Sequence, residues 1–154
     1  MKISTEIMLD GHYYLNASTD FTSFEFDSIG PRGIIRKVVL YTELHIRSFF
    51  NLAFGDKDVH TGLISDLTVS NNNDSEKVLA TVAATLYLFT EYYPNATVIA
   101  SGSTDARTRL YRIGISNNLV EIQKDFIIMG LCNGGWESFC KDQAYTSFLV
   151  RRKP

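Results

Sequence analysis

The segment VIASGSTDARTRLYRIGI, residues 98–115, holds the densest group of side chains suited to binding an anion. A β-type run at 98–100 leads into a Ser-Gly-Ser-Thr turn, and a helical pattern with three arginines follows. The N-terminus of a helix offers free backbone N–H groups and the positive end of the helix dipole. We therefore predict an anion-binding site made of Ser101, Ser103, Thr104, Arg107, Arg109 and Arg112.

The helical pattern of this segment has two faces. At about 100° per residue, Ala106, Leu110 and Ile113 fall within one narrow arc, which predicts the stripe that packs on the core. The arginines spread over the opposite arc. Thr104 or Ser103 suits the N-cap, and Gly114 has the position of a C-terminal cap, so a short helix is expected between them.

The expected partners of the arginines allow two interpretations, a capped surface helix or a ligand site. Asp105 precedes Arg109 by four residues, the order that favours an ion pair within a helix. Arg107 and Arg112 have no acid three or four residues away, so they are expected to bind carboxylates from elsewhere in the chain or an outside anion. Gly102 would let a ligand approach the backbone, whereas the first-turn carboxylate of Asp105 would repel a phosphate.

The composition is that of an ordinary globular domain. The chain has 154 residues, 45% of them hydrophobic and 12% aromatic, which suits a single domain over residues 1–154 with one β-rich core. The formal net charge of −2 provides no overall attraction for nucleic acid or an anionic membrane, so a basic site has to be local.

The chain is expected to be cytoplasmic. Its N-terminal residues, MKISTEIMLDG, lack the apolar region of a signal peptide, and the longest uncharged apolar run, 78–90, is too short to span a bilayer. Cys132 and Cys140 match neither a zinc knuckle nor a CxxC motif, and we expect free thiols in a reducing compartment.

Motifs for metal binding and for nucleophilic catalysis do not stand out in the sequence. His12, His45 and His60 show no HxxxH or HExxH spacing, and Asp56-x-Asp58 lacks the glycine and glutamate of an EF-hand. No nucleophile elbow or Cys–His pairing is recognisable. We predict no metal and no resident cofactor, and leave open whether the chain is an enzyme.

Hydrophobic periodicity predicts an α+β fold. Strands are expected at 22–28, 34–44, 49–54, 63–69, 96–100, 127–131, 136–139 and 145–150, and helices at 76–93, before Gly114 and over 119–126. The order β-β-β-β-α-β-α-α-β-β-β implies a mostly antiparallel sheet of about seven strands with three helices. Gly30-Pro31-Arg32-Gly33 is expected to turn the first two strands into a hairpin.

The predicted helix 76–93 is apolar almost all round. Asn73 and Glu76 have the spacing of a capping box at its start. A helix without a polar face packs on more than one side, so this one is expected either between the sheet and other parts of the chain or at a homodimer interface.

Four segments together resemble a family of small, uncharacterised bacterial proteins common in Bacteroidota. They are FTSFEFDSIGPRGIIRKVVLYTEL, FFNLAFGD, LTVSNNNDSEKVLATVAATLYLFTEYYP and SGSTDARTRLYRIGI. The resemblance covers nearly the whole chain, and ARTRLYR is its most specific part. It implies a free-standing domain and no particular activity.

The element order also resembles the fold of GCN5-related N-acetyltransferases. That resemblance implies that the turn before the long helix binds the pyrophosphate of acetyl-CoA and that a tyrosine of a later helix acts as general acid. The corresponding residues here are Asn71, Asn72, Asn73 and Lys77 for the cofactor and Tyr111 for the acid. This turn departs from the family pattern, because it has no glycine and carries two acids where phosphates would lie.

Three functions follow as hypotheses. The chain is a non-catalytic binding or interaction module with an anion-accepting helix N-terminus, an acyl-CoA-dependent N-acyltransferase, or a nucleic-acid-linked module of the RNA-binding or toxin type. The first two imply an anionic small molecule as ligand, and the third predicts binding that weakens steeply with salt.

Overall fold

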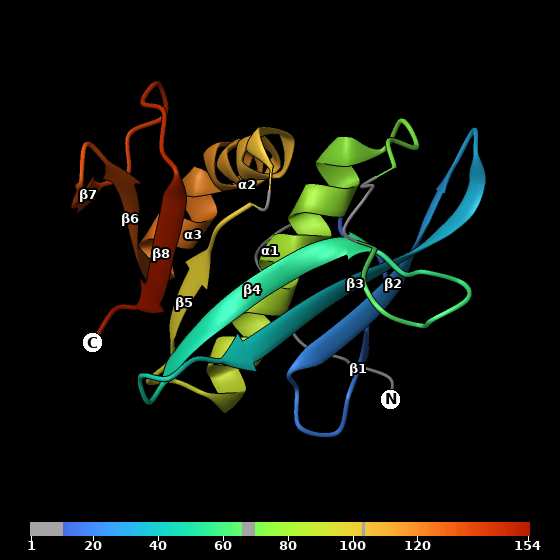
Figure 1. The fold of residues 1–154 in the computed structure, drawn as a ribbon, viewed down its shortest axis with the longest axis horizontal. Helices are drawn as coiled ribbons and strands as arrows, with labels where there is room; N and C mark the ends of the chain where they lie inside the picture. Colours follow the sequence, from blue (N-terminus) through green and yellow to red (C-terminus); the bar gives the residue numbers. More distant parts are fainter. Residues whose placement is uncertain (1–10, 66–69, 103) are drawn as a thin grey trace.

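A computed structural model describes residues 11–65, 70–102 and 104–154, which form one eight-stranded sheet and three helices (Figure 1). The strands are β1 (Asn16–Ala17), β2 (Ser23–Gly30), β3 (Gly33–Glu43), β4 (Phe49–Asp56), β5 (Thr97–Ala100), β6 (Phe126–Cys132), β7 (Gly135–Ser138) and β8 (Ser147–Arg152). The helices are α1 (Ser75–Tyr92), α2 (Asp105–Asn117) and α3 (Leu119–Asp125).

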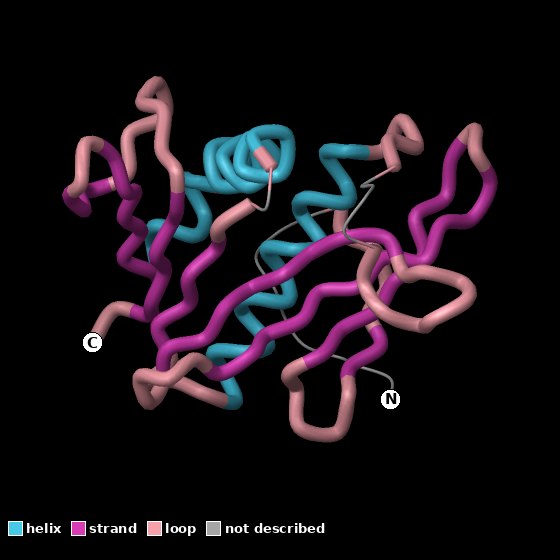
Figure 2. The backbone as a smooth tube through the Cα atoms, viewed as in Figure 1, coloured by secondary structure: helices cyan, strands magenta, loops and turns pink. Residues whose placement is uncertain are grey.

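The sheet is mixed but mostly antiparallel. Its strand order is β1-β2-β3-β4-β5-β8-β6-β7, and only the β4–β5 pair is parallel. A parallel pair needs a crossover connection, which here contains α1. The α+β class and the predicted order of elements are therefore confirmed, and Figure 2 shows how the helices group beside the strands.

The four strands before α1 differ in detail from the prediction. The short strand β1 was not predicted, whereas the hairpin of β2 and β3 around the Gly-Pro-Arg-Gly turn is confirmed. The predicted strand 63–69 lies partly outside the described residues, which exclude 66–69. In its described part, Ile64 forms an isolated bridge with Lys57.

Strands β4 and β5 diverge after a short pairing. Residues 49–52 pair with 97–100, but β4 continues to Asp56 beside β3 while β5 ends and the chain turns toward α2 (Figure 1). The result is a wedge in the sheet that opens toward the N-terminal end of α1. Because α2 covers this wedge, the two strand ends, α1 and α2 meet in one place.

Helix α1 is buried along most of its length. The hydroxyls of Thr81, Thr85 and Thr90 are buried with it and donate to backbone carbonyls of the preceding turn, so they carry little penalty for burial. One side of α1 packs on the sheet and another on α2, as the all-round apolar sequence predicted. Its apolar faces are thus covered within a single chain. No helix in the described residues is long and apolar enough to cross a membrane.

Helix α2 docks through a different face from the predicted one. Ala106 is exposed, and the buried residue of this helix is Tyr111. The inward face follows Arg107, Tyr111 and Gly114, which lie on one side of a helix at spacings of four and three residues. The predicted stripe was wrong at Ala106, which is exposed, whereas Leu110 and Ile113 are half-buried. Tyr111 is the most deeply buried side chain of the helix, because a tyrosine buries far more apolar surface than an alanine.

Gly114 does not end α2, contrary to the prediction, because the helix continues to Asn117. A Cβ at Gly114 would lie only 3.2 Å from Cδ2 of Leu79 in α1. The glycine therefore serves the contact between two helices rather than a cap.

Candidate functional site

An apolar cavity lies between the three helices and the sheet, and Tyr111 forms part of its wall. The cavity has a volume of about 70 Å³, and side chains from all three helices and from β4, β5 and β8 line it. Burial raises the pKa of Tyr111, although a backbone hydrogen bond from Phe54 and the nearby charge of Arg107 act in the opposite direction. A neutral phenol thus lies at the wall of the apolar cavity.

A second cavity lies beside the first, toward the N-terminus of α1. Its volume is about 200 Å³, and it is lined by Lys37, Phe54, Ser70, Asn71, Asp74, Ser75, Val78, Leu79 and Leu110. Leu79 also lines the apolar cavity. This intermediate cavity therefore has apolar side chains on the inner side and polar groups from the loop before α1.

A third cavity of about 530 Å³ lies at the N-terminal end of α1. Its lining is polar, namely Gly11, Asn71, Asn73, Asp74, Ser75, Glu76, Lys77, Ala80, Asn117 and Asn118. Asn71, Asp74 and Ser75 line the intermediate cavity as well. The shared residues make the three cavities neighbours, with the polar cavity at one end and the apolar one at the other.

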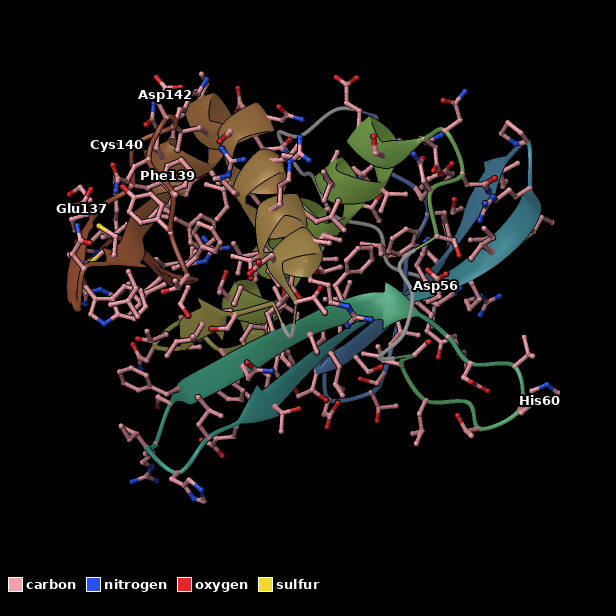
Figure 3. The ribbon with its side chains drawn as sticks, turned by 45° about the horizontal axis from the view of Figure 1, so that its top comes forward. Asp56, His60, Glu137, Phe139, Cys140 and Asp142 are labelled. Atoms are coloured by element: carbon pink, nitrogen blue, oxygen red, sulfur yellow. The ribbon has the colours of Figure 1, made fainter. Side chains whose placement is uncertain are left out.

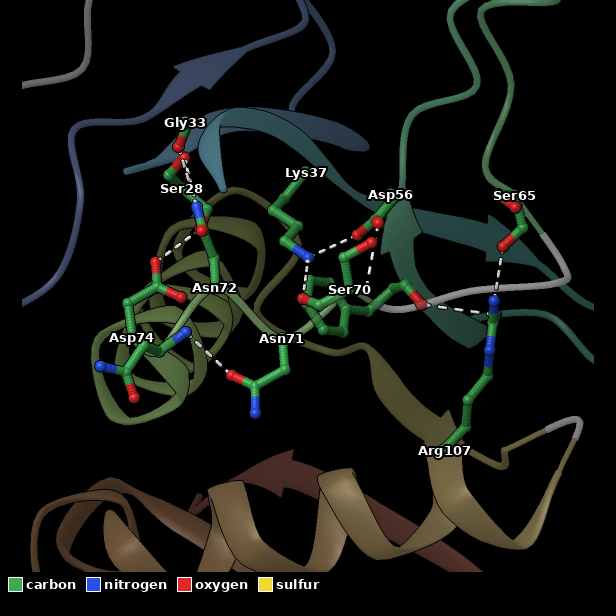
Figure 4. Close-up of polar contacts among 12 residues, drawn as sticks. Ser28, Gly33, Lys37, Asp56, Ser65, Ser70, Asn71, Asn72, Asp74 and Arg107 are labelled. Atoms are coloured by element: carbon green, nitrogen blue, oxygen red, sulfur yellow. Dashed lines mark hydrogen bonds and ion pairs between the residues drawn. The ribbon is translucent and has the colours of Figure 1, made fainter. Parts of the chain in front are cut away.

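A buried ion pair between β3 and β4 holds the loop before α1 in place at Ser70. Nζ of Lys37, a residue 1% exposed, donates to a carboxylate oxygen of Asp56 and, at 2.9 Å, to the carbonyl oxygen of Ser70 (Figure 4). The other carboxylate oxygen of Asp56 accepts from the backbone N–H of Ser70 at 3.0 Å. Both charges are therefore paired, and together they fix the position of Ser70.

Asn72 ties the same loop to the β2–β3 hairpin. Its side chain is fully buried; Nδ2 donates to the carbonyl oxygen of Gly33 at 2.9 Å, and Oδ1 accepts from the backbone N–H of Arg32 at 2.8 Å. A Cβ on Gly30 would stand 2.0 Å from the carbonyl oxygen of Asn72, so glycine is required there. In this structure Asn72 supports the loop and does not line any of the cavities described above.

Asp74, not Asn73, is the N-cap residue of α1, and its side chain does not cap the helix. Its carboxylate instead accepts hydrogen bonds from the hydroxyls of Ser28 and Tyr13. The predicted capping box of Asn73 and Glu76 was wrong, because Asn73 takes a left-handed conformation with φ of 60° before the helix begins. The first turn of α1 therefore presents N–H groups without a capping side chain beside the polar cavity.

The predicted arginine site is not gathered into one pocket. Thr104, one of the two residues predicted as N-cap, caps α2 by accepting from the backbone N–H of Arg107 at 3.2 Å. A Cβ at Gly102 would lie 2.2 Å from the backbone nitrogen of Thr108, so the close approach at this glycine is made by the chain itself. The hydroxyl of Ser101 bonds to that of Ser147, and Ser103 lies outside the described residues.

The three arginines differ in their surroundings. The guanidinium of Arg107 points inward and donates to the carbonyl oxygens of Ser65, at 2.5 Å, and Phe54 (Figure 4). No hydrogen bond or ion pair joins Arg109 or Arg112 to another residue in the described part of the chain, so the predicted Asp105–Arg109 pair is not formed. None of the three lines the cavities described above.

A metal site is not evident among the residues that the structure describes, where no three His, Cys, Asp or Glu side chains come close enough to hold an ion. Figure 3 shows Asp56 at the end of β4 and His60 far out on the loop that follows. Asp56 is committed to its ion pair, and Asp58 accepts from the backbone N–H groups of His60 and Thr61. The Asp56-x-Asp58 motif is thus part of the fold.

Sequence reasoning missed Lys37 and Asp56, although the signal was present. Inward positions on a strand recur every second residue. Lys37 continues the inward series of Val39 and Tyr41 on β3, and Asp56 continues that of Leu52 and Phe54 on β4. A lysine and an aspartate at inward positions of neighbouring strands predict a buried ion pair.

No curated protein and no solved structure matches this chain significantly. A model of one protein family does match, and it covers residues 10–153, which is nearly the whole chain and includes every element described above. The chain therefore belongs to DUF6934, a family of unknown function.

Proposed function

We propose that this protein binds an elongated small molecule with an anionic head and a narrow, less polar tail, and that a thioester of coenzyme A is the class to test first. The observation that carries the proposal is the series of three cavities, polar at the N-terminus of α1 and apolar at Tyr111. Ligand sites combine an apolar interior with a few placed polar groups, and this series has that character.

The head group would lie at the N-terminal end of α1. The first-turn N–H groups have no capping side chain, and the helix dipole adds positive potential there. The carboxylate of Asp74 already accepts two hydroxyl donors, which leaves Lys77 and Glu76 as opposing charges at the mouth. The resemblance to acetyltransferases, with its equivalent turn before the long helix, supports phosphates as the head group.

The tail would extend past Leu79 toward Tyr111. Tyr111 is the titratable side chain that lines the apolar cavity, and its raised pKa keeps it protonated at neutral pH. A protonated phenol can donate a hydrogen bond to a thioester or a proton to a leaving thiolate. Binding comes first, and acyl transfer to an amine would then be measured separately on the same complex.

Binding can be tested by thermal unfolding and calorimetry with acetyl-CoA, free CoA and pantetheine. A ligand at a hundred times its Kd adds about 2.7 kcal/mol to the unfolding free energy. We expect acetyl-CoA and CoA to stabilise the protein, pantetheine to do so less, and Lys77→Gln to weaken binding several-fold. Lys124→Gln, a change at an exposed lysine of α3, is the matched control. Absence of stabilisation by all three compounds would refute the proposal.

A second candidate function rests on Arg109 and Arg112, which have no ion-pair partner among the described residues. Two unpaired guanidinium groups on one short helix suit a phosphate ligand, either a small anion or single-stranded RNA. The double variant Arg109→Gln/Arg112→Gln should then abolish a salt-sensitive interaction with RNA while leaving CoA binding intact. Salt-independent or unchanged RNA binding would exclude this role.

A further inference from the structure

The opposite end of α1 carries a second, chemically different cavity. It has a volume of about 440 Å³ and lies where the C-terminal end of α1 meets the ends of β3 and β4. Four of its lining residues are aromatic, Tyr41, Phe50, Tyr92 and Tyr93. None of its lining residues lines the three cavities of the proposed binding site.

The aromatic lining is an ordered array of rings. Phe50 and Tyr93 lie 5.6 Å apart between ring centroids, and Tyr92 and Tyr93 lie 5.1 Å apart at a steep angle. Phe50 is buried, whereas the side chain of Tyr92 is 56% exposed. The array therefore leads from the core to the surface. Its outer ring, Tyr92, stacks one face on Phe21 with 5.0 Å between ring centroids and is otherwise partly accessible to a ligand.

The charge at this cavity is negative. Glu43 is the charged residue among those that line it, and no lysine, arginine or histidine lines it. Glu43 follows Tyr41 by two positions on β3 and pairs with Phe50 on β4, so its side chain lies on the same face of the sheet as these rings. Its carboxylate accepts from the backbone N–H of Ser48 at 3.2 Å, which holds it beside the cavity.

Two further features add negative potential. Burial raises the pKa of Tyr93, and the nearby Asp20, Tyr92 and Glu43 raise it further, so two carboxylates act on this ring. The last turn of α1 itself has no basic residue, but Arg152 of β8 donates to Oγ1 of Thr90 at 2.8 Å and to the carbonyl oxygen of Tyr87 at 3.1 Å, so the partial negative charge of this helix end is offset only in part. Aromatic faces, carboxylates and a helix C-terminus each favour a cation.

From this arrangement we propose that the Tyr41–Glu43–Phe50–Tyr92–Tyr93 cavity is a binding site for a small organic ammonium ion, such as a quaternary amine. Aromatic rings attract a weakly hydrated cation through their negative faces, while an adjacent carboxylate supplies charge. A metal ion suits the cavity less well, because Glu43 is the lone charged oxygen ligand in the lining and hard cations need several. An anion is disfavoured by the surrounding carboxylates.

Choline is the probe that tests the site, with its neutral carbon analogue, in which a quaternary carbon replaces the nitrogen, as the matched control. Amide NMR spectra of the full chain should show shifts for residues around Ser48 and Asn95 on addition of choline at millimolar concentration. The neutral analogue should bind at least about fivefold more weakly, which is the range of a partly exposed cation–π contact.

Two variants locate the interaction. Glu43→Gln keeps a hydrogen-bond acceptor for Ser48 but removes the charge, and Tyr92→Leu removes the exposed ring; each should weaken choline binding several-fold. Glu76→Gln, at the other end of α1, should leave it unchanged. Equal binding of choline and its neutral analogue, or shifts confined to other parts of the protein, would overturn the proposal. So would a Glu43→Gln variant that binds choline as tightly as the parent protein.

Discussion

The two ends of α1 are held in place by different kinds of interaction. At the N-terminal end, a buried lysine, a buried asparagine and two aspartates form a hydrogen-bonded network that joins the 70–74 loop to β2, β3 and β4. At the C-terminal end, Tyr41 stacks on Phe89 with 4.0 Å between ring centroids, and Phe50 meets Phe89 edge to face. One end depends on directional contacts between polar groups, and the other on the packing of rings.

The difference explains why the two ends carry different cavities. Hydrogen bonds to buried groups fix atoms to within a few tenths of an ångström, so the polar end can hold an uncapped helix terminus in a set position for a ligand. Aromatic rings bury large areas and contribute stability, and a ring at the surface of such an array can attract a cation to its exposed face. We therefore expect substitutions at the aromatic end to affect mainly stability, and those at the polar end to affect loop geometry as well.

The largest effect is expected from Phe89→Ala at the aromatic end. Phe89 is fully buried and contacts the rings of Tyr41, Phe50 and Tyr93, so its truncation leaves a cavity among them. The free energy of unfolding should fall by about 4 kcal/mol, measured by urea denaturation. Tyr92→Ala, at an exposed ring one turn away, should cost about 1 kcal/mol or less. Similar costs for both would mean that the ring array is not the main stabilising element of this end.

Next in size is Lys37→Met at the polar end, which leaves the carboxylate of Asp56 buried without its cation. The unfolding free energy should fall by about 3 kcal/mol, again by urea denaturation. The double variant Lys37→Met/Asp56→Leu should recover part of this loss, because no uncompensated charge remains. If the single variant were as stable as the parent protein, the ion pair would not be what secures this loop.

Asn72→Ala tests the directional contacts without changing charge. The substitution removes the acceptor of the Arg32 N–H and the donor to the Gly33 carbonyl, and the unfolding free energy should fall by about 2 kcal/mol. Asn71→Ala is the control, because the Asn71 side chain is exposed and bonds to the backbone N–H of Asn73. Amide exchange of the 70–74 loop should accelerate in Asn72→Ala and not in Asn71→Ala. If amide exchange of the loop changed equally in the two variants, the loop would be held by other contacts.

The strands and α1 could be predicted from the sequence, whereas the buried face of α2 could not. The strands and α1 follow from periods of two and 3.6 residues, which depend on local side-chain direction. The face of α2 could not be deduced in this way, because Arg107 satisfies carbonyls on β4 and on the chain beyond it, and Gly114 fits a leucine of α1. Those partners are distant in sequence, and periodicity contains no information about them.

Some residues of the turn before α1 that the sequence offered as ligand contacts, namely Asn71, Asn73 and Lys77, line the cavities of the proposed site, and so does Tyr111, whereas Asn72 does not. The three arginines of α2 line none of these cavities, because the type and spacing of side chains carry no information on where a cavity forms. The role of Asn72 was also unpredictable, since three consecutive asparagines look alike in sequence and only the middle one is buried.

The smallest effect, and the finest test of the aromatic end, concerns alkaline pH. Burial raises the pKa of Tyr41 well above its ordinary value, although the hydrogen bond with Thr85 opposes this. The unfolded chain can ionise this phenol near its ordinary pKa of about 10 whereas the folded chain cannot, so the stability that Tyr41 contributes is present below that pH and is lost as the pH rises above it. Near neutral pH, Tyr41→Phe should lower the unfolding free energy by about 1 kcal/mol, because the hydrogen bond with Thr85 is lost. Its disadvantage relative to the parent protein should be constant up to about pH 9 and shrink as the pH rises through about 10 to about 11 in urea denaturation. A constant difference across that range would mean that Tyr41 ionises in the folded protein, and that the ring array admits water.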